Sequence, residues 1–143
     1  QTGTIRVRTM LKLIDEIESV GDSCYNMSRT IQRKKENKIW FTQELRNNLN
    51  AMFDLIEEAF EEMIQNLQKD YMMVNANKAY GIEMKINKMR NMLKENHLES
   101  IESGNYKYNA GVIYSDLIAQ NERLGDFIIN VSQAISEGNR KTS

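Results

Sequence analysis

The stretch Glu122-Arg123-Leu124-Gly125-Asp126, followed by Asn130, Val131 and Ser132, decides the fold because it occurs twice. The upstream copy reads Glu18-Ser19-Val20-Gly21-Asp22, followed by Asn26, Met27 and Ser28, at a shift of 104 positions. Leu117-Ile118 and Ile135 match Leu13-Ile14 and Ile31 under the same shift. Internal repeats of this kind mark an architecture built from one unit used more than once. We therefore expect two related helical units in this chain.

Length and composition bound the class of protein. A chain of 143 residues without proline, 41% hydrophobic and 27% charged, is typical of one globular helical domain. The net charge of −1 argues against a nucleic-acid partner, which usually requires a basic surplus. The single Cys24 excludes an internal disulfide and suits a reducing compartment. No apolar run reaches the 18 residues of a membrane span. Because the chain starts at Gln1 and turns helical at once, we expect a piece of a longer polypeptide.

Apolar residues at three- and four-residue spacing predict four long helices, over residues 4–35, 42–67, 70–96 and 109–137. We expect Thr42 and Asp70 to cap the second and third helices, residues 97–108 to form a loop, and Gly138-Asn139 to end the fourth helix. Short connections predict an all-α, antiparallel up-down bundle in a single domain, residues 1–143. Residues 1–37 would be the last helix of a first, incomplete unit, and residues 42–138 a complete three-helix unit.

The first helix carries one apolar stripe that we expect to be buried. The stripe consists of Met10, Leu13, Ile14, Ile17, Val20, Cys24, Met27 and Ile31. On this interpretation Cys24 is a small buried hydrophobe rather than a nucleophile. Trp40 and Phe41 should cover the end of the bundle.

The repeated segment places a polar column beside each apolar stripe. Glu18, Asp22 and Asn26 stand four residues apart, as do Glu122, Asp126 and Asn130, at the edge or surface of a helix. Stacked carboxylates repel unless neutralised, and carboxylate and amide oxygens suit hard or borderline cations. A solvated face is the alternative, since Glu57/Glu61 and other acid pairs show the same spacing. Gly21 and Gly125 lie mid-helix, where glycine costs about 1 kcal/mol, which predicts close backbone approach by a neighbouring helix or a ligand at both positions.

Enzyme function finds little support in the residues. His97 is the only histidine, so the Glu-x-x-His pairs of di-iron bundles are missing, and we expect His97 to be a helix-end residue. The glycines are scattered and form no phosphate-binding loop. We therefore expect a protein that is not an enzyme.

These residues resemble the PhoU family of phosphate-uptake regulators, whose mark is an E(D)xxxD motif often written Glu-Arg-Ile-Gly-Asp with a following Asn-Ile. Glu122 to Asp126 with Asn130-Val131 matches it closely, and Glu18 to Asp22 with Asn26-Met27 less tightly. The resemblance covers nearly the whole chain and implies three-helix repeats, the first incomplete here. It also implies metal clusters at Glu18, Asp22, Glu122 and Asp126, supported by Asp15, Asn26 and Asn130. Iron, zinc, magnesium and manganese are the candidate metals. Glu83-x-x-x-Asn87 departs from the family by lacking one acid of a further pair.

The resemblance implies a non-enzymatic regulatory domain in phosphate uptake. PhoU-like domains also form the cytoplasmic tail of sodium/phosphate cotransporters, so we expect such a tail, itself soluble, at the cytoplasmic side of the membrane. Its partners would be the transporter, a signalling protein or a second copy of the chain. The alternatives are a free-standing regulator of a phosphate ABC transporter and its sensor kinase, and a plain helical scaffold without metal.

Overall fold

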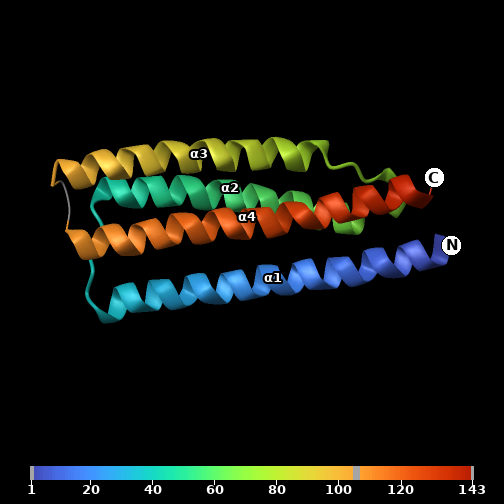
Figure 1. The fold of residues 1–143 in the computed structure, drawn as a ribbon, viewed down its shortest axis with the longest axis horizontal. Helices are drawn as coiled ribbons and strands as arrows, with labels where there is room; N and C mark the ends of the chain where they lie inside the picture. Colours follow the sequence, from blue (N-terminus) through green and yellow to red (C-terminus); the bar gives the residue numbers. More distant parts are fainter. Residues whose placement is uncertain (1, 105–106, 143) are drawn as a thin grey trace.

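The computed structural model describes residues 2–104 and 107–142. They form four long helices, α1 (Thr2–Glu36), α2 (Gln43–Gln68), α3 (Asn77–Glu102) and α4 (Tyr108–Thr142), with a short 3-10 helix η1 (Tyr71–Met73) before α3. No strand occurs in these residues, and successive helices reverse direction (Figure 1). The expected all-α, up-down arrangement is thereby confirmed. None of the helices in the described ranges is long and apolar enough to cross a membrane.

Helix ends follow the predicted signals in part. Thr42 caps α2 as expected, because its side chain accepts a hydrogen bond from the Leu45 N–H at 3.3 Å. The expected cap at Asp70 is wrong for α3: Asp70 caps η1 by accepting from the Met72 N–H, and α3 begins only at Asn77.

The predicted loop over residues 97–108 is too long, since α3 continues to Glu102 and α4 begins at Tyr108. The turn expected at Ser103-Gly104 is present, and residues 105–106 lie outside the described residues. The ring of His97 lies 5.3 Å from that of Tyr114, which ties this part of α3 to α4. The expected stop at Gly138-Asn139 does not occur. Both residues are buried within α4, and the Asn139 side chain donates to the Val74 carbonyl at 3.2 Å. Tertiary contacts outweigh local stop signals at both places.

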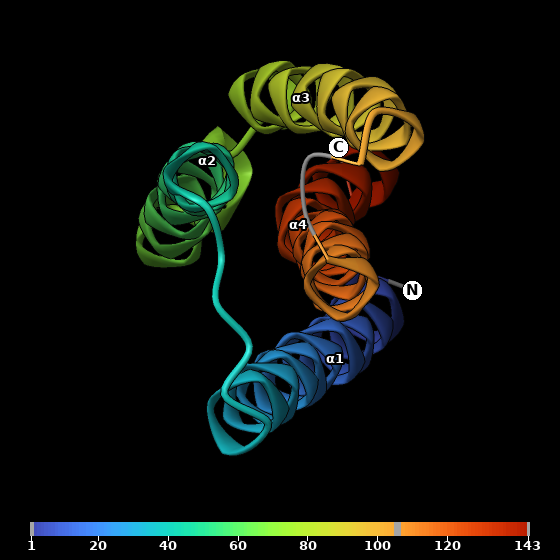
Figure 2. The same cartoon turned by 90° about the vertical axis from the view of Figure 1, so that its left-hand side faces the viewer.

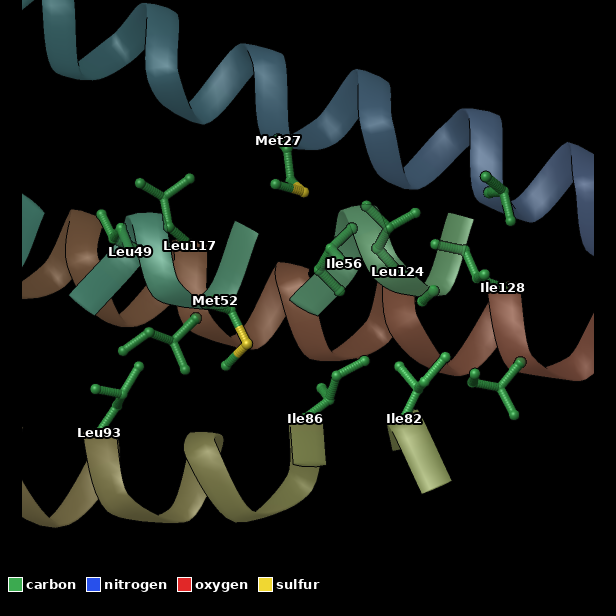
Figure 3. Close-up of a cluster of buried hydrophobic side chains, with 14 of the residues drawn as sticks. Met27, Leu49, Met52, Ile56, Ile82, Ile86, Leu93, Leu117, Leu124 and Ile128 are labelled. Carbon is green, nitrogen blue, oxygen red and sulfur yellow. The ribbon is translucent and has the colours of Figure 1, made fainter. Parts of the chain in front are cut away.

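Three of the helices share one hydrophobic core. Ile56 of α2, Ile86 of α3 and Leu124 of α4 point toward one another in this core (Figure 3). Met52, Ile82 and Ile128 are among its fully buried side chains. Branched aliphatic residues at helical spacing thus close a three-helix bundle from α2, α3 and α4.

Helix α1 packs chiefly against α4 and lies apart from α2 and α3 in the end view (Figure 2). The contact is antiparallel and partly polar. Asn130 donates to the Glu16 carboxylate at 3.2 Å, and Gln120 donates to the Thr30 hydroxyl at 2.9 Å. Gln120 is the repeat equivalent of Glu16, so α1 and α4 meet through equivalent faces.

The expected burial of the α1 stripe is wrong for most of its members. Val20 and Met27 are buried against the core and Leu13 partly so. The exposed members are Met10, Ile14, Ile17, Cys24 and Ile31. The physical reason is rotation of α1, which turns the line through Thr9, Ser23 and Thr30 toward α4. Phe41 is buried as expected, whereas Trp40 is 77% exposed and does not cover the bundle end.

Candidate functional site

The α4 copy of the acidic column lies at the seam between α3 and α4. Glu122, Asp126 and Asn130 are all half-buried. The Glu122 carboxylate accepts from the Arg90 guanidinium of α3 in an ion pair of which both side chains are mostly covered. A guanidinium therefore neutralises one of the two stacked carboxylates.

An acid of α3, Glu83, interacts with the other carboxylate, Asp126. Burial, and then the negative charge of Asp126, raise the pKa of Glu83 above its ordinary value. Burial also raises the pKa of Asp126, which the positive charge of Arg90 opposes. At the seam the Arg90 guanidinium thus acts on Glu122 and Asp126, Asp126 acts on Glu83, and burial disfavours the charged forms of Asp126 and Glu83.

Gly125 allows this close approach of α3 and α4. A Cβ atom at this position would lie 3.1 Å from Ile86 Cδ1 and 3.3 Å from Ile56 Cδ1. Because Ile86 stands three residues after Glu83 and four before Arg90, the same turns of α3 that press on the glycine also present the polar groups. The predicted close approach at Gly125 is confirmed.

The α1 copy of the column has different surroundings. Glu18, Asp22, Asn26 and the neighbouring Asp15 are exposed. Within the described residues neither the Glu18 nor the Asp22 carboxylate forms an ion pair or side-chain hydrogen bond. A Cβ atom placed on Gly21 would have nothing within 4 Å, so among the described residues no neighbouring helix makes the predicted close approach there. The structure does not bring the four predicted metal ligands together.

The donor groups at the seam limit what it could bind. Among the residues that the structure describes, no three His, Cys, Asp or Glu side chains are grouped closely enough to hold a metal ion. The Glu122 carboxylate is already paired with Arg90. Asn87 is an amide at the position where the PhoU pattern has the second acid of a further acidic pair. This donor set does not fit the multinuclear cluster that the resemblance implies. Glu83, Asp126 and the Asn87 amide offer oxygen ligands for a single hard cation that retains water.

Sequence reasoning noted Glu83 only as a departure from a family pattern and did not identify Arg90. A signal for both was present. Glu83, Asn87 and Arg90 recur at three- and four-residue spacing beside the buried Ile82 and Ile86, which marks a polar edge next to a core stripe.

No protein-family model, no curated protein and no solved structure matches this chain. The resemblance to PhoU proteins therefore rests on the repeated motif and its layout alone.

Proposed function

We propose that this chain is a non-enzymatic regulatory domain in phosphate uptake, of the PhoU-like kind that forms the cytoplasmic tail of a sodium-dependent phosphate transporter. The observation that carries the proposal is the Glu-x-x-Gly-Asp motif, present once on each of two antiparallel neighbouring helices, α1 and α4. In this role the domain acts through contacts of its helical faces with the transporter or a signalling partner.

The α3–α4 seam is the place where such a domain would sense a cation. Glu83 and Asp126, with Asn87, would hold one divalent ion such as Mg²⁺ or Mn²⁺ through oxygen atoms. The ion would replace the repulsion between the two carboxylates by attraction, and so tighten α3 against α4. Iron and zinc suit this set less well, because zinc in proteins usually takes nitrogen or sulfur ligands.

Calorimetric titration of the 143-residue chain with Mn²⁺ tests the cation site. We expect one bound ion, lost in the double variant Glu83→Gln/Asp126→Asn. The matched control is Glu57→Gln/Glu61→Gln, which removes two acids, one helical turn apart, from the exposed side of α2. Equal Mn²⁺ binding by both double variants would rule out the seam as the site.

Phosphate uptake by cells that carry the full-length gene tests the regulatory role. Removing residues 1–143 should abolish the change in uptake rate between phosphate-rich and phosphate-poor medium, while the Glu57→Gln/Glu61→Gln control should keep it. Uptake that stays equally regulated after the removal would contradict the proposal.

Two other functions share the fold. A free-standing regulator of a phosphate ABC transporter and its sensor kinase would be encoded without membrane-spanning segments upstream, so the upstream reading frame separates it from a transporter tail. A plain helical scaffold is favoured by one observation, the Arg90–Glu122 ion pair, because an internal cation already neutralises the ladder. Absence of Mn²⁺ binding, together with uptake that stays equally regulated after the removal of residues 1–143, would support the scaffold.

A further inference from the structure

The outward face of α1 is an apolar surface without a neighbour among the described helices. Its large side chains are between 43% and 63% exposed. They are Val7, Met10, Leu11, Ile14, Ile17, Tyr25 and Ile31. Contiguous exposed apolar patches beyond a few hundred Å² are unusual on monomeric proteins and mark interaction sites.

The repeat identifies an equivalent face that is covered. Shifted by 104 positions, the outward residues of α1 fall on residues of α4 that are buried. The pairs are Val7/Gly111, Met10/Tyr114, Ile14/Ile118, Ile17/Asn121, Gly21/Gly125, Cys24/Ile128, Tyr25/Ile129, Ser28/Ser132 and Ile31/Ile135. Leu11 is the exception, since its equivalent Ser115 is exposed. The helices that supply contacts to this α4 face are α2 and α3.

Two contacts to α4 show which kinds of side chain would pack on the equivalent positions of α1 if this face were covered in the same way. Ile86 of α3 and Ile56 of α2 press on Gly125, the equivalent of the open Gly21. Asn66 of α2 donates to the buried Ser132 hydroxyl at 2.8 Å, and Ser132 is the equivalent of the exposed Ser28.

The acidic residues at the edges of the two equivalent faces, Glu18 on α1 and Glu122 on α4, differ in the same way. Glu122 is neutralised by Arg90 of α3, whereas the equivalent Glu18 is exposed and has no cation within the described part of the chain. An occupant equivalent to α3 would therefore carry a cation opposite Glu18.

A second copy of this chain cannot supply an equivalent pair of helices. In the part of the chain that the structure describes there are two faces of this kind, one on α1 and one on α4, but only one helical pair, α2 and α3, which packs on α4 of the same chain. Every closed assembly of identical chains would leave one face per chain without such a pair.

We infer that the outward face of α1 docks an antiparallel pair of amphipathic helices, equivalent to α2 and α3, supplied by polypeptide other than residues 1–143. This pair places branched aliphatic side chains over Gly21, an amide donor near Ser28 and a basic residue opposite Glu18. The inference rests on the repeat and on burial, and it is independent of the proposed role in phosphate uptake.

The helical pair of this chain is itself the probe. A second copy of residues 41–107 is placed before residue 4, because residue 4 is the repeat equivalent of residue 108, where α4 begins. Cys24 lies within the outward face of α1 and is the only cysteine in the 143-residue chain and in the extended chain. Its reaction rate with a thiol reagent therefore measures whether the face is covered. We expect the rate in the extended chain to fall at least tenfold below that in the 143-residue chain.

Gly21→Leu is the matched variant. Because Gly21 is open in the 143-residue chain, the variant should leave the Cys24 rate there unchanged. In the extended chain it should restore fast reaction, since leucine would meet the aliphatic side chains that the added pair places over this position. An unchanged Cys24 rate on extension, whether the added helices are unfolded or merely undocked, would overturn the inference.

The oligomeric state of the 143-residue chain provides the second measurement. Sedimentation should show a monomer with reactive Cys24. A dimer in which Cys24 is protected, and which Gly21→Leu dissociates, would assign the face to a second copy and overturn the helical-pair inference.

Discussion

Helices α1 and α4 carry the same motif but place it in opposite surroundings. On α4, Glu122 and Asp126 are half-buried against α3, and Gly125 contacts Ile56 and Ile86. On α1, Glu18 and Asp22 are exposed, and no other helix of the described chain approaches Gly21. The difference shows that the motif does not by itself determine burial or ionisation; the helices packed over it do.

The repulsion between the two carboxylates of the motif therefore has a different effect on stability on α1 and on α4. Two exposed carboxylates four residues apart on a helix repel by only a few tenths of a kcal/mol, because water and salt screen them. Once covered, the same pair requires a cation or a proton, and the Arg90 guanidinium and the raised pKa values of Asp126 and Glu83 meet this requirement. We therefore make four predictions, each of which compares a covered position on α3 or α4 with an exposed position elsewhere in the chain.

The two glycines should give the largest contrast. Gly125→Leu forces a side chain against Ile86 Cδ1 and Ile56 Cδ1, and such overpacking of a core costs about 2–3 kcal/mol of unfolding free energy. A Cβ atom at Gly21 would have no described atom within 4 Å, so Gly21→Leu should gain roughly 0.8 kcal/mol from higher helix propensity. Urea unfolding of both variants measures the contrast, and similar effects at the two positions would show that the α3–α4 packing is looser than described.

Much of the fold was predictable from the sequence because helix periodicity and caps are local. Four helices, the Thr42 cap and the close approach at Gly125 all follow from spacing and residue type. Where tertiary contacts override local signals, the predictions fail. Gly138 and Asn139 would end an isolated helix, but in this fold both are buried and the Asn139 side chain reaches the Val74 carbonyl.

The site was less predictable than the fold. Periodicity located the acidic column, yet it could not say that α3 would cover the α4 copy and leave the α1 copy open. Arg90 lies on α3 and Glu122 on α4, 32 residues apart in the sequence, so only packing brings them together. The α1 stripe was misplaced for a similar reason: a helix with apolar residues on two sides does not reveal which side its single neighbour will cover.

Ser132 and Ser28 provide the next contrast. Ser132→Ala removes the hydroxyl that accepts from the buried Asn66 side chain at 2.8 Å, and leaving this donor less satisfied should cost about 1–2 kcal/mol. Ser28 is exposed and its hydroxyl donates to the Tyr25 carbonyl of its own helix, so Ser28→Ala should change stability by less than about 0.5 kcal/mol. Thermal unfolding of the two variants compares them. Equal losses would contradict the difference in cover between α1 and α4.

Arg90 of α3 and Arg33 of α1 each form an ion pair with α4, so their replacement compares the α3–α4 contact with the α1–α4 contact. Arg90→Met leaves the half-buried Glu122 without its cation and should cost about 1 kcal/mol, while the pKa of Asp126 rises further because Arg90 no longer opposes the effect of burial. Arg33→Met removes the ion pair to Asp116 at 2.8 Å, where both side chains are about half exposed, and should cost under roughly 0.5 kcal/mol. NMR titration of the Asp126 carboxyl in both variants is the decisive measurement. A pKa of Asp126 that does not move in Arg90→Met would show that the guanidinium does not act on it.

The smallest effect concerns pH and Glu83. Because the pKa of Glu83 is raised on folding, by burial and then by Asp126, the folded chain holds this proton more tightly than the unfolded chain. The free energy of unfolding should therefore fall as pH rises from the ordinary glutamate value through the raised folded value. Glu83→Gln removes this titration, so the variant should match the unmodified chain below that window and exceed it above, by less than about 0.5 kcal/mol since the group stays partly hydrated. Glu57→Gln, on the exposed side of α2, removes the same charge but keeps Glu83, so its stability should differ from that of the unmodified chain by the same amount throughout this pH window. Urea unfolding at a series of pH values compares the variants. If Glu83→Gln and Glu57→Gln respond alike, the α3–α4 seam is as open to water as the outward face of α1.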